Sequence, residues 1–268
     1  MIVDETIRRL RESHGDILDA ERIGRLVVGV GFTAVQLSGG SCGLAATDPS
    51  GMSRRACDHG RTEEACAPGR WRGRSVREVL ESAEDGPVTR AVRMAVLNAV
   101  SARVIARGSY RIEAGRDPLE WVDTAAGRTV TLVGAFPSYM DKLAARPCTL
   151  RILEMEPEAV PERYRPFYVP ADRAGDVLPA SDAVLITGST LVNRTLDGLL
   201  ALVPRRAFKA LVGPSGGLLP DVLFRRGVDV IGTIRILDPE LMFAIVSEAG
   251  FGFHLFGTCA EKICILHD

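Results

Sequence analysis

The chain has 268 residues, enough for one large domain or two modest ones. Hydrophobic residues make up 46% and charged residues 25%, the balance of a globular protein with a substantial core. The formal net charge of −1 argues against a nucleic acid or an acidic membrane surface as the partner.

The first 23 residues carry acidic and basic side chains throughout, so they lack the apolar segment of a signal peptide. No later stretch reaches about 18 unbroken apolar residues, the length that spans a membrane. We therefore expect a cytoplasmic protein. Its six cysteines are expected to be thiols, because the cytosol keeps cysteines reduced.

The N-terminal part combines predicted helices with a predicted hairpin. Ile7, Leu10, Ile17 and Leu18 share one face at helical spacing, which predicts a helix over 3–20. Apolar runs on either side of a Gly-Gly turn predict a β-hairpin, and small and apolar residues after Pro87 predict a helix packed on several sides. The remaining predictions are strands at 25–38 and 40–47, a long loop at 48–74, and helices at 75–83 and 87–106.

From residue 129 onwards, apolar strand-like runs alternate with amphipathic segments. Strands without polar alternation are covered on both faces, and helices between them indicate parallel crossovers. This pattern predicts an α/β fold whose second domain is a doubly wound parallel sheet. We place the boundary within the irregular segment 108–128, which gives domains 1–110 and 111–268. The predicted helices of this half are 138–145, 193–203, 220–226 and 239–249.

The predicted strands of this half end in loops of small and hydroxyl-bearing residues. In open α/β sheets, ligands bind at the carboxyl ends of the strands, near the point where the strand order reverses. Backbone N–H groups exposed there suit an anion or a flat ligand, although the same residue types also make ordinary turns and helix caps. The loop residues predicted to bind a cofactor are Gly134, Phe136, Pro137, Thr187, Gly188, Ser189, Thr190, Asn193, Gly213, Pro214 and Ser215.

Glu154 ends the second strand of this half, twenty residues after Gly134. An acidic side chain at this spacing binds ribose hydroxyls in nucleotide-binding units, although strand ends also carry charge simply to meet water. One glycine stands where a dinucleotide site has three, and the "GPSGG" loop lacks the Lys-Ser/Thr pair of a triphosphate site. S-adenosylmethionine or a related nucleoside without pyrophosphate is therefore a candidate ligand.

Four polar or aromatic residues outside these loops are also of interest. Asn98 lies mid-helix among apolar residues, so its amide either reads a ligand or pairs with the backbone. Tyr139 stacks on a ligand ring or, the more usual case, is buried in the core. His254 is expected to be structural, and Lys262 is expected to form a solvated pair with Glu261.

Several longer motifs resemble the "putative heavy-metal chelation" family of bacterial and archaeal proteins, and they occur in the family's order. They are "GSCGLA", "AVRMAVLNA", "VTLVGAFP", "LRILEMEPE", "LPASDAVLITGSTLVNRTLDGLL" and "LVGPSGGLLPDVLFRRGVDVIGT". The resemblance implies an enolase N-terminal-like domain, then a Rossmann-like domain, with a ligand site in the cleft between them and a homodimer. It adds Thr33 and Asn98 as substrate-binding residues and implies a metal chelator or its precursor as the small-molecule ligand.

Direct metal binding finds weak support in the spacing of the cysteines and histidines. The chain contains no C-x-x-C motif and no pair of histidines at i, i+4. The weak candidates are Cys57, His59 and Cys66. Three hypotheses follow: a binder or enzyme acting on a metal chelator, an enzyme using S-adenosylmethionine or a nucleoside, and a non-catalytic metal-binding module built on the 48–74 loop.

Overall fold

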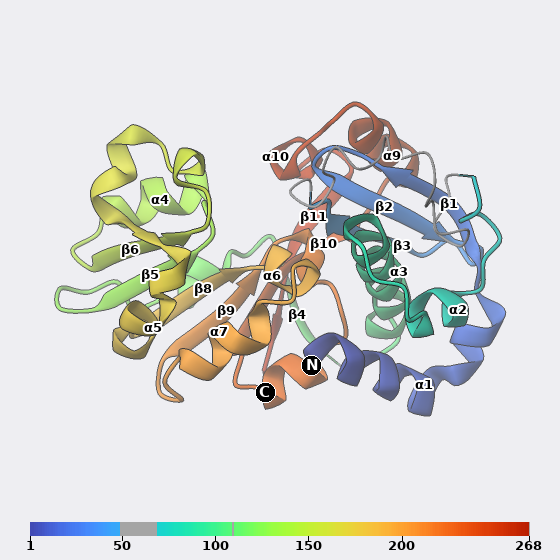
Figure 1. Ribbon diagram of the computed structural model, residues 1–268, viewed down its shortest axis with the longest axis horizontal. Helices are drawn as coiled ribbons and strands as arrows, with labels where there is room; N and C mark the ends of the chain where they lie inside the picture. Colours follow the sequence, from blue (N-terminus) through green and yellow to red (C-terminus); the bar gives the residue numbers. More distant parts are fainter. Residues whose placement is uncertain (49–68, 109, 268) are drawn as a thin grey trace.

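The computed structural model describes residues 1–48, 69–108 and 110–267, so most of the predicted 48–74 loop lies outside the described residues. Within the described part, a small antiparallel sheet and a larger, mostly parallel sheet lie side by side, each with helices (Figure 1). None of the described helices combines the length and the apolar character that crossing a membrane requires.

The N-terminal part forms a three-stranded antiparallel sheet in the order β1-β2-β3. Its elements are α1 (Ile2–Ala20), β1 (Ile23–Val28), β2 (Phe32–Leu37), β3 (Cys42–Ala46), α2 (Val76–Glu81) and α3 (Pro87–Ile105). The predicted apolar face of α1 is confirmed, because Ile7, Leu10, Ile17 and Leu18 are all buried. The hairpin at Gly39 and Gly40 is also confirmed, with Gly40 at φ 88°.

The single strand predicted over 25–38 is wrong, because it is two strands joined by a tight turn at 29–31. The N–H of Gly29 donates to the carbonyl of Phe32 at 2.9 Å and closes this turn. A β-carbon on Gly29 would lie 2.3 Å from the carbonyl oxygen of Val246, so only glycine allows this close approach. The apolar run alone gave no sign of the reversal.

The second half forms a sheet of eight described strands in the order β4-β11-β10-β9-β8-β5-β6-β7. The strands are β4 (Arg111–Ala114), β5 (Thr129–Val133), β6 (Thr149–Glu154), β7 (Tyr168–Pro170), β8 (Ala183–Thr187), β9 (Phe208–Val212), β10 (Val230–Ile236) and β11 (Ala260–Leu266). The six strands from β10 to β7 are parallel. Counted from β5, their order is that of a Rossmann sheet, 3-2-1-4-5-6, which confirms the predicted fold class.

The helices of this half are mostly short. They are α4 (Pro137–Ala144), α5 (Ala174–Val177), α6 (Ser189–Val192), α7 (Leu196–Leu202), α8 (Asp221–Arg225), α9 (Pro239–Ser247) and α10 (Gly252–Leu255). Single 3₁₀ turns occur at Pro118–Trp121, Pro157–Ala159, Glu162–Phe167, Ala171–Arg173, Leu178–Ala180 and Pro214–Gly216. The predicted helices 138–145, 220–226 and 239–249 are confirmed within a few residues, and 193–203 begins later than expected.

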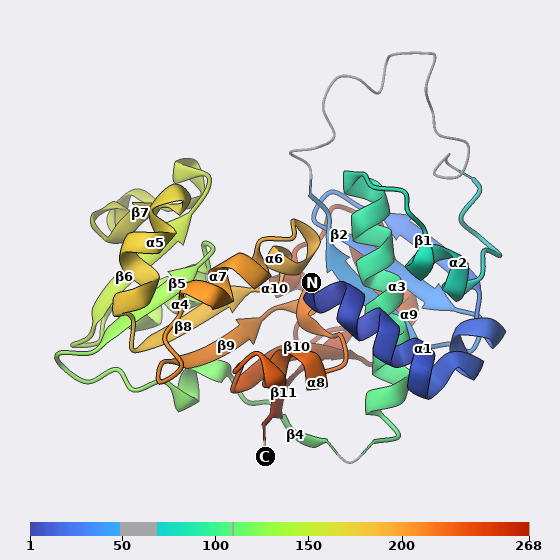
Figure 2. The ribbon, with the colours of Figure 1, turned by 60° about the horizontal axis from the view of Figure 1, so that its bottom comes forward.

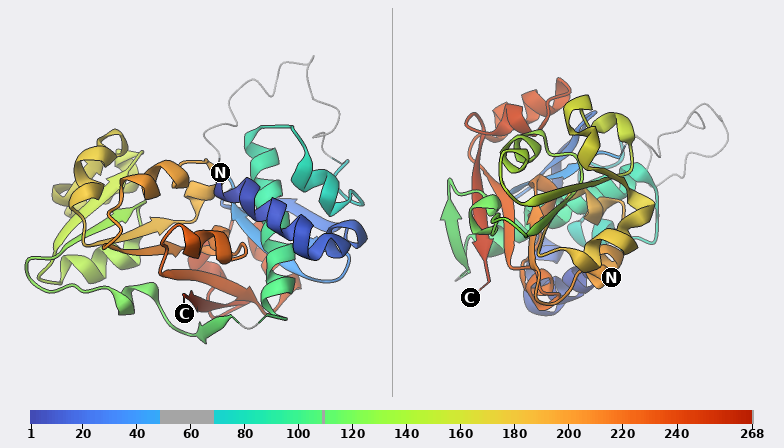
Figure 3. Two further views of the ribbon diagram at one scale, coloured as in Figure 1. Left: turned by 90° about the horizontal axis from the view of Figure 1, so that it is seen from below. Right: turned by 90° about the vertical axis from the view of Figure 1, so that its left-hand side faces the viewer.

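Strand β11 runs antiparallel to β10, which the alternation of strands and helices did not indicate. The reason is that α9 and α10 do not cross back over the parallel sheet. They cover the small sheet instead, where Met242, Phe243 and Val246 pack against Ala34 and Leu44 (Figures 1 and 3). The chain therefore re-enters the large sheet from the edge at which it left. The division at residue 110 stays a prediction.

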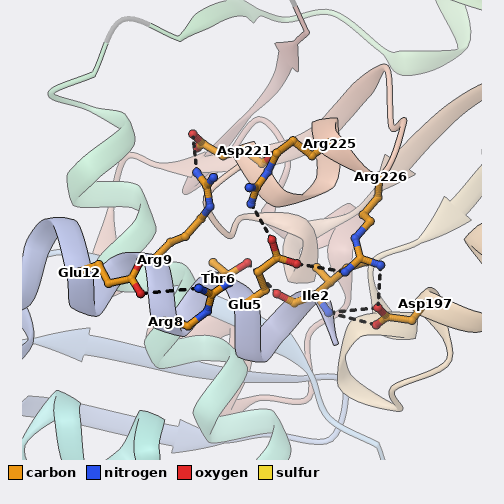
Figure 4. Close-up of polar contacts among 10 residues, drawn as sticks. All are labelled: Ile2, Glu5, Thr6, Arg8, Arg9, Glu12, Asp197, Asp221, Arg225 and Arg226. Atoms are coloured by element: carbon orange, nitrogen blue, oxygen red, sulfur yellow. Dashed lines mark hydrogen bonds and ion pairs between the residues drawn. The ribbon is translucent and has the colours of Figure 1, made fainter.

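Helix α1 extends from the small sheet to the helices of the large one (Figure 2). The N–H of Ile2 lies 3.2 Å from both carboxylate oxygens of Asp197, which lies on α7 (Figure 4). Glu5 forms ion pairs of 2.7 Å with Arg225 and 3.0 Å with Arg226. The hydrogen bond from Arg226, aided by the charge of Arg225, lowers the pKa of Glu5. We call this set of contacts the α1 clasp.

Candidate functional site

The three predicted loops lie at one edge of the large sheet. Strands β5, β8 and β9 are parallel neighbours, with Val133 beside Ile186 and Thr187 beside Val212. Their carboxyl ends therefore lead into adjacent loops at the point where the strand order reverses, between β5 and β8. This is the edge at which the sequence predicted a ligand.

The single glycine of the first loop has a structural explanation. Gly134 has φ 106°, a conformation that L-residues avoid, and its N–H donates to the carbonyl of Leu153 at 2.9 Å. A β-carbon here would lie 3.0 Å from Cγ2 of Thr187, across the reversal point. Gly134 therefore lets the first and second loops pack together, a role that requires no pyrophosphate.

A cleft of about 810 Å³ opens beside these loops and is closed on the other side by the small sheet and α10. Its size lies within the usual range for a small-molecule site. Eight of the predicted site residues line it: Phe136, Pro137, Thr187, Gly188, Ser189, Gly213, Pro214 and Ser215. The structure thus brings the central part of each predicted loop into one cavity.

Six predicted site residues do not line this cleft: Thr33, Asn98, Gly134, Glu154, Thr190 and Asn193. The Asn193 side chain accepts hydrogen bonds from the N–H and the hydroxyl of Thr195, the N-cap residue of α7. Thr190 donates its hydroxyl to the carbonyl of Thr187 at 2.6 Å. Both side chains therefore organise the second loop, as capping residues do.

Glu154 lies at the turn where its spacing predicted it, but its carboxylate is engaged by the backbone. One oxygen accepts the N–H of Ala135 at 2.8 Å, and the other accepts those of Met155 at 2.6 Å and Glu156 at 3.2 Å. The side chain thus joins the ends of β5 and β6. A ribose hydroxyl would have to share these oxygens with three backbone donors.

Asn98 and Ser215 connect the two halves behind the cleft. The Asn98 amide nitrogen donates to the carbonyls of Leu44 at 2.7 Å, Ser215 at 3.1 Å and Pro214 at 3.3 Å. The Ser215 hydroxyl accepts the N–H of Ala46 at 2.8 Å. The sequence left two roles open for Asn98, binding a ligand or pairing with the backbone. The structure shows its amide nitrogen paired with the backbone. Thr33 is buried and hydrogen-bonds Thr47 at 3.0 Å.

The sequence analysis missed the aromatic and charged residues of the opposite wall. Phe251 and Phe253 of the α10 segment line the cleft, are 49% and 71% exposed, and stack with ring centroids 6.4 Å apart. Lys262 also lines it, with its ammonium 4.7 Å from the Phe256 ring centroid. The predicted Lys262–Glu261 pair is wrong, because Glu261 pairs with Arg235 at 2.8 Å across β10 and β11.

Tyr139 and Asp117 form a polar unit in the cleft wall. Tyr139 is buried, as expected, and stacks on Phe136 at 5.5 Å. Burial and a hydrogen bond to Asp117 raise the pKa of the Tyr139 hydroxyl. Burial also opposes ionisation of Asp117, but hydrogen bonds from Tyr139, Leu119 and Lys142 outweigh it and lower its pKa. Asp117 is therefore a carboxylate and Tyr139 a neutral phenol at neutral pH.

The described residues contain no cluster of three or more His, Cys, Asp or Glu side chains placed to hold an ion. Burial raises the pKa of the Cys42 thiol to about 11 and that of Cys264 to about 12, so both are protonated thiols at neutral pH. His254 makes a local hydrogen bond, in which its Nδ1 accepts the N–H of Phe251 at 2.9 Å. The candidates Cys57, His59 and Cys66 lie outside the described residues.

The strand order and the cleft define a two-part α/β protein with a small-molecule-sized cavity between a Rossmann-type sheet and a small antiparallel sheet. The DUF364 family model, described as "Putative heavy-metal chelation", matches residues 117–265. A second model with the same description, DUF4213, matches residues 11–101. The chain belongs to the DUF364 family, which confirms the resemblance seen in the sequence motifs.

Solved structures of this family share the fold over the whole chain. A protein of unknown function from Pyrococcus horikoshii aligns with a TM-score of 0.79 at 19% identity, covering 100% of both chains. One from Desulfitobacterium hafniense has a TM-score of 0.72 at 23% identity, covering 99% of this chain and 97% of its own. An uncharacterized protein of Methanocaldococcus jannaschii is 40% identical over 64 residues, which spans a quarter (25%) of that protein and 24% of this chain.

Proposed function

We propose that the cleft binds a flat organic anion, a metal chelator or its precursor, and that any heavy metal arrives as part of that ligand. The observation that carries this proposal is the composition of the cleft. Aromatic rings from α10 face hydroxyls and small residues at the strand ends, and Lys262 contributes a positive charge. Such a cavity combines stacking, backbone donors and one cation.

The aromatic wall supports a planar ligand. Phe251 and Phe253 are large apolar side chains left exposed beside a cavity, and exposed apolar clusters of this kind usually mark binding sites. Phe136 lines the cleft from the first loop and Phe32 lines it from the small sheet, so a ring entering the cleft has aromatic surface available from both halves of the protein. Burial of a flat ring there removes apolar surface from water on both sides.

The charges support an anionic group on that ligand. Lys262 has no carboxylate partner among the described residues, whereas Arg116, the other cation of the cleft, is paired with Glu120 at 2.6 Å. Asp117 is already paired with Lys142 at 3.3 Å. Among the described charged residues of the cleft, Lys262 is therefore the one available to pair with an anionic ligand. We assign the metal-binding atoms to the ligand, since the described residues contain no cluster of three or more His, Cys, Asp or Glu side chains that could hold an ion.

The first test is native mass spectrometry of the purified protein before and after treatment with EDTA. We expect an organic mass that stays bound, and a metal-bearing mass that EDTA converts to the organic mass alone. A metal bound without any organic mass would overturn the proposal. It would direct attention to Cys57, His59 and Cys66.

The second test is calorimetric titration with 8-hydroxyquinoline-5-sulfonate, a flat anionic chelator, with and without zinc. We expect Phe253→Ala and Lys262→Ala each to weaken binding about five- to tenfold, the cost of one aromatic or charged contact. Met155→Ala is the matched control, because Met155 is an exposed apolar residue away from the cleft. Equal loss in all three variants, or no change in any, would contradict the proposal.

A second candidate ligand is S-adenosylmethionine or a related nucleoside. The Rossmann strand order and the place of Glu154 at the end of β6 support it. Calorimetry with S-adenosylmethionine and S-adenosylhomocysteine tests it, with Glu154→Gln as the variant. Binding lost in that variant, at unchanged thermal stability, would favour the nucleoside. An absence of heat with both compounds would remove it.

A further inference from the structure

A second cavity, of about 790 Å³, lies next to the cleft and shares part of β10 with it. Its walls are the C-terminal half of α3, the β2–β3 hairpin turn, and strands β10 and β11. It shares only Pro214, Thr233, Ile234 and Ile263 with the cleft. None of the charged residues that line it belongs to the site proposed above.

Three residues lining this second cavity carry buried oxygens without a hydrogen-bond partner among the described groups. They are Ser41 Oγ, Asn98 Oδ1 and Thr233 Oγ1. Asn98 is 3% and Thr233 5% exposed. A buried polar atom without a partner costs about 1–3 kcal/mol, so several at one cavity require an explanation.

The orientation of the Asn98 amide is fixed by its surroundings. Its nitrogen faces the carbonyl oxygens of Leu44, Pro214 and Ser215, so turning the amide over would place oxygen against oxygen. Oδ1 is therefore the unpartnered atom. A β-carbon built on Gly217 would lie 3.4 Å from Thr233 Oγ1 and 3.6 Å from Asn98 Cγ. Two of the unpartnered groups thus flank one small residue.

The rest of the cavity combines an apolar wall with a positive rim. Ile105, Ile236 and Ile265 line it from α3, β10 and β11. Arg103 pairs with Glu21, whereas Arg107 has no carboxylate partner among the described residues. Seven positions separate Asn98 from Ile105 at the end of α3, about 10 Å at the helical rise of about 1.5 Å per residue, and Arg107 follows two residues later.

We infer that this cavity is a second ligand site, for a small organic acid with an apolar body and a hydrogen-bond donor at the end opposite its acid group. The acid group pairs with Arg107, and the apolar body lies on the isoleucine wall. The donor end, an amine or a hydroxyl, supplies a partner for Asn98 Oδ1 and Thr233 Oγ1 beside Gly217. Its occupancy does not depend on the function proposed for the cleft.

The test is calorimetric titration with two acids of one shape, 4-(4-aminophenyl)butanoate and 4-phenylbutanoate. Only the first carries a donor opposite the acid, so we expect it to bind about tenfold more tightly, the worth of one buried hydrogen bond. Arg107→Gln should weaken both acids. Equal affinity for the two acids, or no binding of either, would overturn the inference.

Two cavity-filling variants locate the binding. Ala102→Trp fills the second cavity from an exposed position on α3, and Ser138→Trp fills the cleft from an exposed position on α4. We expect Ala102→Trp to abolish binding of 4-(4-aminophenyl)butanoate and Ser138→Trp to leave that binding unchanged. The reverse result would place the probe in the cleft and contradict a second site.

Discussion

The two halves of the protein meet at two junctions of opposite character. At one, α1 and α3 pack against α8 and the loop after β9 through a continuous apolar core, in which Leu10 and Leu97 join Leu219 and Leu223. At the other, the halves face each other across the cleft, and Phe253 stays exposed. The closed junction fixes how the halves lie, which leaves the open one free to bind a ligand.

The closed junction also carries directed polar contacts that an apolar core lacks. The buried hydroxyl of Ser101 accepts the N–H of Leu219 at 3.0 Å, and the Asn98 amide binds the Pro214–Ser215 loop. That loop lines the cleft. The closed junction therefore sets the position of part of the open one, and changes in the first should be felt in the second.

The largest expected effect is a difference between the two junctions in how much each contributes to the free energy of unfolding. Leu97 is fully buried, so Leu97→Ala should lower the free energy of unfolding by about 3 kcal/mol through lost burial and a new cavity. Phe253→Ala at the open junction should change it by less than about 0.5 kcal/mol, because that side chain is mostly exposed. Urea unfolding measures both. Similar losses would mean that the cleft wall is part of the core.

The next effect tests whether the junctions are coupled. Asn98→Leu leaves the carbonyls of Leu44, Pro214 and Ser215 without their donor, which should cost about 2 kcal/mol. It should also weaken 8-hydroxyquinoline-5-sulfonate binding in the cleft. Ser101→Ala is the control, since it removes a junction hydrogen bond that does not involve the Pro214–Ser215 loop. Unchanged affinity in Asn98→Leu would show that the junctions are independent.

The sequence predicted the parts of this arrangement that local patterns determine. The spacing of apolar residues gave the buried face of α1, and the rule for strand ends gave the loops that meet at the cleft. The spacing from Gly134 to Glu154 predicted correctly that the Glu154 carboxylate lies at this turn. It could not reveal that backbone N–H groups of the turn already donate hydrogen bonds to both carboxylate oxygens.

The missed features depend on tertiary placement. The predicted helix 239–249 was expected to cross over the large sheet, yet it packs on the small sheet, since Phe243 and Val246 find apolar partners there. This placement reverses β11 and brings Phe253 and Lys262 to the cleft. The one local signal was the run "GFGFHLFG", whose exposed aromatic residues among glycines are typical of a binding loop rather than a core helix.

A smaller effect concerns the α1 clasp and its dependence on pH. The native pKa of Glu5 lies below its ordinary value of 4.5, so its contribution to stability is complete above that value. The contribution is lost as the pH falls through the lowered native pKa. Glu5→Gln should therefore destabilise the protein at pH 7, and the difference from the unchanged protein should shrink as the pH falls through the lowered native pKa. Glu12→Gln is the matched control, since Glu12 forms a single 3.6 Å pair with Arg8 on the same helix.

The smallest effect concerns the ion pair that joins Arg9 on α1 to Asp221 on α8. Arg9 and Asp221 are 3.6 Å apart and both partly exposed, so solvent screens their attraction. Arg9→Ala should change the free energy of unfolding by no more than about 0.5 kcal/mol, well below Leu97→Ala. If thermal unfolding instead shows Arg9→Ala and Leu97→Ala to be comparable, the charges rather than the apolar core hold the closed junction. Added salt would then weaken the closed junction, because it screens exposed ion pairs and leaves apolar burial intact.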